Sequence, residues 1–159
     1  MKSLPMIALA LTIFFSHYDL AKAACPSLEG KFSCSGNTKE FNDDIEIRQK
    51  INGAGAYIYY LPYFQGSEGN LNYEKTADGV KYLRKESTHM GEMDTTYQTK
   101  CVNENSILST VVGVLDGGIF VTYQGNFHLQ SDNSLQIKET LFMAMGNQTL
   151  ETKATCVKK

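Results

Sequence analysis

The sequence predicts an all-β protein, a single antiparallel up-and-down β-barrel of about 8–10 strands. Apolar and polar side chains alternate along most of the chain, as they do in strands with one dry face and one wet face. Turn residues such as Asn52-Gly53 recur roughly every 8–12 residues. Connections are short, which favours hairpins over parallel crossovers, and no useful stretch of helical period is present.

The first half of the chain predicts five strands. A short strand is expected over 31–35, followed by a half-buried strand over 45–51 in which isoleucines alternate with charged residues. Residues 56–64 are apolar and aromatic on both faces. Strands are expected over 70–76 and 80–87, and each follows a loop that contains glycine and an acidic residue.

The second half predicts five more strands, over 94–101, 107–115, 119–130, 135–143 and 150–156. The clearest part is 106–157, which predicts a four-strand antiparallel meander. Within it, 119–130 is a long strand with one dry and one wet face, and Phe120 is the only large apolar side chain on the wet face. These strands favour a meander of sequential neighbours. We expect a barrel rather than the alternative, a β-sandwich, because closure leaves no unpaired strand edge.

The N-terminal residues 1–23 have the features of a signal peptide. Lys2 precedes an apolar run that is shorter than the roughly 20 residues needed to cross a bilayer. Ala21-Lys22-Ala23 predicts cleavage after Ala23, which leaves one β-barrel domain over 24–159. Cys25 raises the question of a bacterial lipid anchor, but Lys22 stands where such a signal has an aliphatic residue. We therefore expect an exported chain, periplasmic or secreted.

The processed chain would carry thirteen basic and sixteen acidic side chains, a net charge of −3. Its basic residues are not clustered, so neither nucleic acid nor an anionic membrane surface is an expected partner. After residue 23 no apolar stretch approaches the length of a transmembrane segment.

Four cysteines, an even number, predict two disulfides in an exported protein. They are Cys25, Cys34, Cys101 and Cys156. Four cysteines allow three pairings, and the sequence does not choose among them. We favour Cys25–Cys34, which would close a short N-terminal loop, and Cys101–Cys156, which would tie the last strand to an earlier one.

The segment Leu28-Glu29-Gly30-Lys31-Phe32 resembles the first-strand signature of lipocalin-like and related calycin barrels, in which a glycine lies two positions before an aromatic residue, usually Trp. Here Phe32 takes the place of Trp. The match covers about five residues, and it implies a barrel architecture without a ligand or catalytic residue. The chain also looks like small exported β-proteins of Gram-negative bacteria, a resemblance that implies no activity.

Two charged residues are expected to point to the same face of their strand as apolar residues two positions away, which we describe as having the same parity. Glu139 falls on the parity of Ile137 and Leu141, and Arg84 falls on that of Tyr82. A carboxylate on the dry face must be paired, protonated or in contact with water. One hypothesis places Glu139 and Arg84 inside the barrel, where they would orient a ligand; the alternative is a register shift that turns both toward solvent.

Tyrosines supply the remaining candidate ligand-binding residues. Their rings can line a pocket for an apolar or amphipathic molecule, although ordinary cross-strand packing uses the same residues. The leading prediction is non-covalent binding of a small apolar or amphipathic ligand in the barrel cavity. With Arg84 and Glu139, the predicted lining is Tyr57, Tyr59, Tyr82, Tyr97 and Tyr123.

The rival function is a protein-interaction or inhibitor module with a filled core, which would expose the aromatic run 57–64 as a contact patch. No catalytic motif is present, so an enzyme is disfavoured, and no cofactor is expected. His89, Met90 and Met93 have the ligand types that suit Cu(I), but chance explains this loop better, and we expect no metal site. Asn147-Gln148-Thr149 is a glycosylation sequon at an expected turn.

Overall fold

The computed structural model describes residues 25–37, 44–63 and 71–159. The expected signal peptide lies outside these residues, as does residue 64 of the aromatic run. The described chain contains no helix with the length and apolar character that a membrane crossing requires. It forms ten strands: β1 (Gly30–Gly36), β2 (Asp44–Ile51), β3 (Tyr57–Tyr63), β4 (Leu71–Thr76), β5 (Lys81–Thr88), β6 (Gly91–Asn103), β7 (Ser106–Leu115), β8 (Gly118–Leu129), β9 (Leu135–Met143) and β10 (Gln148–Lys158).

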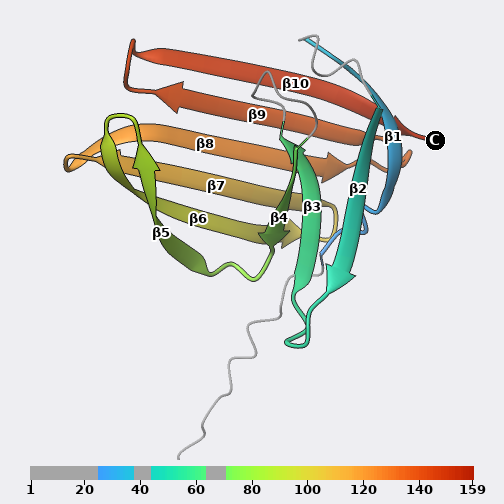
Figure 1. The fold of residues 1–159 in the computed structure, drawn as a ribbon. Coiled ribbons are helices and arrows are strands. Elements are labelled where there is room, and N and C mark those ends of the chain that lie inside the picture. The colour runs from blue at the N-terminus through green and yellow to red at the C-terminus, as the bar shows by residue number, and fades with distance from the viewer. Residues whose placement is uncertain (1–24, 38–43, 64–70) are drawn as a thin grey trace, which may run out of the picture.

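All ten strands belong to one sheet, in the order β4-β3-β2-β1-β10-β9-β8-β7-β6-β5. Every neighbouring pair is antiparallel, and every pair except β1–β10 is consecutive in sequence. The predicted up-and-down all-β architecture is therefore confirmed. The sheet curls into a half-barrel, in which β6–β10 form a long wall and β1–β4 cross over one end of it (Figure 1).

The half-barrel is open between β4 and β5, where the sequence argument expected closure. The linker of residues 77–80 does not turn β5 back onto β4. Instead, the Gly79 amide donates to the Thr99 carbonyl at 2.9 Å, and the Gln98 side chain donates to the Gly79 carbonyl at 2.7 Å. The linker is thus fastened to β6, and β4 and β5 are the edge strands of the described sheet.

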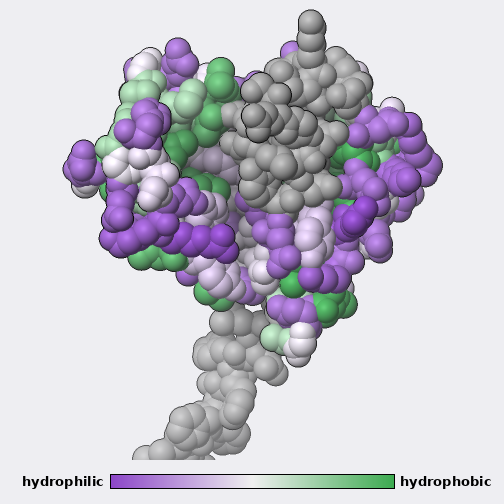
Figure 2. Space-filling model, in the orientation of Figure 1, coloured by the Kyte–Doolittle hydropathy of each residue, from purple (hydrophilic) through white to green (hydrophobic). Residues whose placement is uncertain are grey.

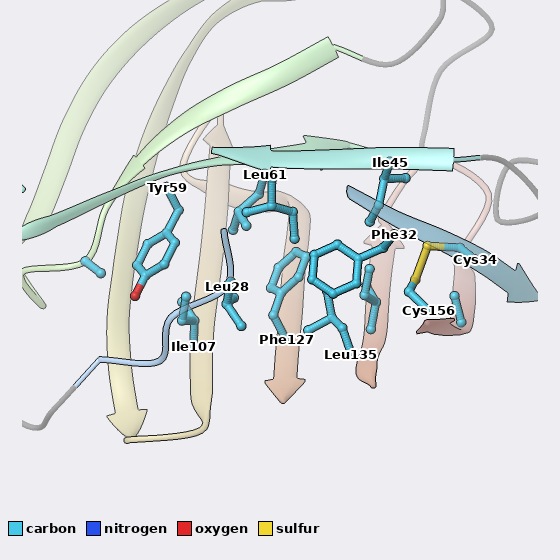
Figure 3. Close-up of a cluster of buried hydrophobic side chains, with 14 residues drawn as sticks. Leu28, Phe32, Cys34, Ile45, Tyr59, Leu61, Ile107, Phe127, Leu135 and Cys156 are labelled. Carbon is cyan, nitrogen blue, oxygen red and sulfur yellow. A yellow bond between two sulfur atoms is a disulfide. The ribbon is translucent and has the colours of Figure 1, made fainter. Parts of the chain in front are cut away.

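The apolar core lies where β1–β3 cross the long wall. Phe32 and Leu61 on the crossing strands face Phe127 and Leu135 on the wall (Figure 3). The inward side chains alternate with exposed ones along β1, β2 and β9, as the period-two pattern predicted. Burial of these side chains is the main source of stability for the fold.

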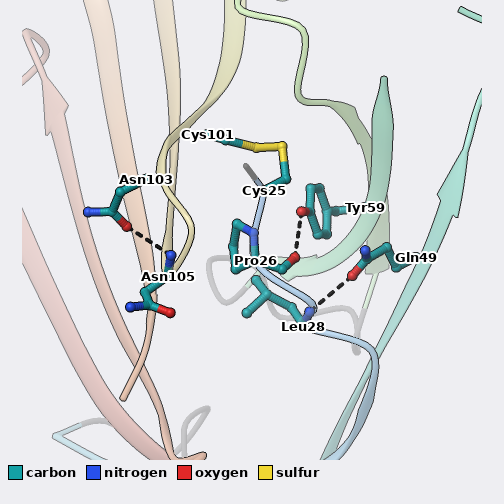
Figure 4. Close-up of a disulfide and its surroundings, with 8 residues drawn as sticks. All are labelled: Cys25, Pro26, Leu28, Gln49, Tyr59, Cys101, Asn103 and Asn105. Atoms are coloured by element: carbon teal, nitrogen blue, oxygen red, sulfur yellow. Dashed lines mark hydrogen bonds between the residues drawn. A yellow bond between two sulfur atoms is a disulfide. The ribbon is translucent and has the colours of Figure 1, made fainter. Parts of the chain in front are cut away.

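The segment Cys25 to Glu29 plugs this end of the half-barrel. Leu28 is completely buried, and its amide donates to Gln49 Oε1 on β2 at 3.0 Å. The Tyr59 hydroxyl on β3 donates to the Pro26 carbonyl at 2.7 Å (Figure 4). Polar groups from two strands therefore satisfy backbone groups of the plug, which lets an irregular segment lie inside the molecule.

Two disulfides are present, and their pairing differs from the one we favoured. Cys25 bonds Cys101 on β6, and Cys34 on β1 bonds Cys156 on β10. Cys34 and Cys156 lie opposite each other in the register of β1 and β10, so the bond staples the first strand to the last. The favoured pairing Cys25–Cys34 is wrong because the plug carries Cys25 across the interior to β6 (Figure 4). Two disulfides are typical of an oxidising, exported environment.

Candidate functional site

Two adjacent rows of inward-facing residues cross the long wall, and their chemistry differs. The apolar row consists of register partners Cys101, Ile107, Phe127, Ile137 and Ala154 on β6–β10. The polar row lies one inward step further along the same strands and consists of Thr99, Ser109, Gly125, Glu139 and Thr152. The four polar side chains of the second row are all buried. A buried polar row of this kind needs a hydrogen-bond partner for each group.

Half of the polar row is satisfied internally. The Thr99 and Ser109 hydroxyls are 3.1 Å apart and share a hydrogen bond. On the other side of Gly125, the Glu139 carboxyl accepts a hydrogen bond from the Tyr123 hydroxyl at 2.6 Å. Two buried oxygens, Glu139 Oε2 and Thr152 Oγ1, have no hydrogen-bond partner among the described residues.

Gly125 makes the Tyr123–Glu139 bond possible. Gly125 is the register partner of Glu139, and the Tyr123 ring folds back over it from two residues away. A Cβ atom at position 125 would lie 2.9 Å from Tyr123 Cζ and closer still to the hydroxyl oxygen. The glycine is therefore required for space, because its φ is not in the left-handed region.

The surroundings of Glu139 favour its protonated form. The carboxyl is completely buried, and this burial raises its pKa from 4.5 to about 7, against the lowering effects of the Tyr123 hydrogen bond and the Lys75 charge. Lys75 on β4 is also affected, since burial lowers the pKa of its ammonium group. Its Nζ lies 5.8 Å from the centroid of the Tyr123 ring, so Lys75 lies over the hydrogen-bond partner of Glu139.

A cavity of about 520 Å³ lies at the gap between β4 and β5. In the space-filling view the molecule is hollowed on this side, with hydrophilic residues along the lower rim (Figure 2). The lining residues from the three strands around the gap are Glu74, Lys75, Thr76, Tyr82, Arg84, Glu86, Tyr97, Gln98 and Thr99. Thr99 of the polar row and Lys75 of β4 therefore both line the cavity.

A network on β5 and β6 shapes the wall of this cavity. The Arg84 guanidinium lies 5.6 Å from the centroid of the Tyr97 ring. The Glu86 carboxylate accepts hydrogen bonds from the Tyr97 hydroxyl and, at 3.2 Å, from the Thr95 hydroxyl. Glu86 is thus occupied by neighbours on β6, while the Arg84 side chain stays exposed at the cavity.

The predicted binding residues fall into three places. Tyr82, Arg84 and Tyr97 line the cavity, and Tyr123 and Glu139 lie buried beside it, behind Lys75. Glu139 has the inward orientation that its parity predicted. Tyr57 and Tyr59 lie elsewhere: Tyr59 is completely buried in the apolar core, and Tyr57 stacks on it with ring centroids 6.1 Å apart.

Sequence reasoning missed Lys75, Glu86, Thr99 and Thr152 as members of the site. Each lies on the inward parity of its strand, so the signal was present but no different from that of ordinary wall residues. Their importance follows from the register, which places Thr152 opposite Glu139, and from the gap, where Lys75 lines the cavity.

Other groups with possible chemistry lie apart from this site. Ser106 Oγ and His128 Nδ1 are 2.7 Å apart as register partners on β7 and β8, a pair that the sequence did not reveal. His89 is exposed in a turn, whereas Met93 is buried. Within the described ranges no three His, Cys, Asp or Glu side chains are grouped as a metal site. Asn147 lies in the exposed β9–β10 turn, with φ of 49°.

Comparison of the chain with protein-family models, with curated proteins and with solved structures found no match.

Proposed function

We propose that this protein is an exported binding protein, periplasmic or secreted, that holds a small amphipathic molecule non-covalently in the cavity between β4 and β5. The single observation that carries the proposal is the cavity itself, which opens where the sheet fails to close. Its volume of about 520 Å³ falls within the range of small-molecule sites, roughly 300–1,000 Å³.

The lining of the cavity supports an amphipathic ligand with an anionic group. Lys75 and Arg84 contribute two cations, and among the described residues neither makes a salt bridge. A carboxylate, sulfonate or phosphate could therefore bind there without displacing an ion pair. Tyr82 and Tyr97 supply ring faces for an apolar or aromatic body.

The rival function, a protein-interaction module, has less support. It requires the aromatic run to form an exposed patch. In the described part of that run, Tyr59 and Leu61 are buried in the apolar core instead, and Ile58 is buried as well.

Isothermal titration calorimetry with naphthalene-2-sulfonate tests the proposal, because this probe combines an anion with an aromatic body. We expect saturable binding of one molecule per chain. Arg84→Gln should weaken binding about tenfold or more, since a hydrogen bond to a charged group contributes about 1.5–3 kcal/mol.

The matched control is Arg48→Gln. Arg48 is an exposed arginine that pairs with Glu46 on β2, away from the cavity. The proposal is wrong if the probe does not bind saturably, or if Arg48→Gln weakens binding as much as Arg84→Gln does.

A further inference from the structure

The two buried oxygens without a partner belong to neighbouring residues. Glu139 on β9 and Thr152 on β10 are register partners and face the same side of the sheet. Side chains directly opposite in an antiparallel pair have Cβ atoms about 4.5–5.5 Å apart. Glu139 Oε2 and Thr152 Oγ1 therefore lie within reach of one additional group that could bond both.

The cost of leaving these atoms unpaired indicates that such a group belongs there. A buried polar atom without a hydrogen bond destabilises a fold by about 1–3 kcal/mol. An apolar pair at these two positions would avoid that cost, as Ile137 and Ala154 do in the adjacent row. Tyr123 already holds Glu139 Oε1, so the carboxyl is positioned with its second oxygen available.

This polar pair is close to the cavity. Lys75 lines the cavity, its Nζ lies over the Tyr123 ring, and its charge acts on Glu139. Lys75 therefore links the cavity to Tyr123, which holds Glu139.

We propose that Glu139 and Thr152 form the inner end of the binding site and hold a hydroxyl group of the ligand. This inference rests on the proposed function. A hydroxyl donates one hydrogen bond and accepts others, so a single group can bond both Oε2 and Oγ1, whether the carboxyl is protonated or ionised. An ammonium group could donate to both oxygens, but it would place a second buried cation close to Lys75. An anionic group would be repelled by ionised Glu139, and both charged groups are costly to bury.

The ligand class is therefore a hydroxylated amphipathic acid. Its anionic group would bind at Lys75 and Arg84, its body would lie against the tyrosines, and its distal hydroxyl would reach Glu139 and Thr152.

The test compares two probes that differ by one hydroxyl, naphthalene-2-sulfonate and 6-hydroxynaphthalene-2-sulfonate, by calorimetry. We expect the wild-type protein to bind the hydroxylated probe about tenfold more tightly. Thr152→Val, which keeps the side-chain shape and removes the hydroxyl, should abolish this preference. Thr152→Ser should keep it, and Thr155→Val on the exposed face of β10 should have no effect.

Each remaining outcome is informative. If both probes bind equally and Arg84→Gln weakens both, the hydroxyl subsite is wrong while the proposed function stands. Retention of the preference in Thr152→Val also overturns the subsite, as does a crystal structure of the hydroxylated complex with only a water between Oε2 and Oγ1. If neither probe binds, both proposals fall.

Discussion

The apolar row and the polar row are neighbours on the same five strands, yet they have different roles. In the apolar row every described position packs into the core beneath the crossing strands β1–β3. In the polar row one position is a glycine and two oxygens have no partner among the described residues. One inward step along each strand thus separates residues that stabilise the fold from residues that are costly to bury.

This difference indicates which part of a half-barrel can hold a ligand-binding site. The crossing strands and the plug of residues 25–29 pack over the apolar row and bury it. The polar row leads instead to the gap between β4 and β5, where the cavity lies. The predictions below test this division of roles, from the largest expected effect to the smallest.

Phe127→Ala in the apolar row should have the largest effect. Phe127 is 1% exposed, and truncation of such a side chain typically costs about 3–5 kcal/mol through lost burial and the cavity left behind. Ser109→Ala in the polar row should cost less, about 1–3 kcal/mol, from the unpaired Thr99 hydroxyl. Denaturant unfolding of both variants measures the difference, and equal costs would contradict the division.

The Cys34–Cys156 disulfide, which lies within the apolar core, should come next. Its replacement by Cys34→Ala with Cys156→Ala should lower the free energy of unfolding by about 2–5 kcal/mol. The measurement is denaturant unfolding, with Cys25→Ala and Cys101→Ala together as the comparison.

The two disulfides should also differ in their reduction. Cys156 is completely buried, whereas Cys25 and Cys101 are half-buried. Dithiothreitol under native conditions should therefore reduce Cys25–Cys101 first, as read by alkylation and peptide mass spectrometry. Earlier reduction of Cys34–Cys156 would show that the apolar end opens more readily than its packing implies.

Glu139 should make the stability depend on pH. Because its pKa rises from 4.5 to about 7 on folding, the folded state holds the proton more tightly than the unfolded state. Stability from this group is then greatest below pH 4.5, falls as the pH rises toward 7, and is lower by about 3 kcal/mol at pH 8. In Glu139→Gln this decline should be absent.

The measurement is the free energy of unfolding at pH 4.5 and pH 8 for both proteins, and the quantity compared is the change between the two pH values. Titrating groups other than Lys75, whose charge interacts with that of Glu139, contribute equally to both proteins. An identical decline in wild type and Glu139→Gln would show that Glu139 is solvated in the folded state.

Gly125→Ala should have the smallest of these effects, about 1–3 kcal/mol from overpacking against Tyr123. In a Tyr123→Leu background, which removes the hydroxyl and the ring that covers Gly125, the same change should cost less, and the remaining cost should come from Phe127 Cε2, 3.2 Å from the added Cβ. Gly53→Ala is the control, because nothing lies within 4 Å of the added methyl group. A cost at position 125 that is undiminished without the Tyr123 ring would disprove our account of this glycine.

Much of the site could be predicted because parity is a local property of a strand. The alternation around Ile137 and Leu141 was enough to predict that Glu139 points inward. The alternation around Tyr82 was enough to predict that Arg84 points to the cavity side. Tyr59 shows the limit of the same reasoning. Residues 56–64 are apolar and aromatic on both faces, so alternation assigned Tyr59 to neither face. We expected it in the cavity lining, whereas the structure buries it in the apolar core.

By itself the sequence determined the strands, their inward faces and the presence of two disulfides. The alternation of apolar and polar residues and the even number of cysteines can both be read directly from the sequence. Only the tertiary structure decided the register of β1 on β10, that Thr152 lies opposite Glu139 and that β4 stays apart from β5. The physical reason is that register and sheet closure depend on backbone hydrogen bonds between residues far apart in sequence. The hydrogen bond from the Gly79 amide to the Thr99 carbonyl is one such bond, and the local periodicity of the sequence does not predict it.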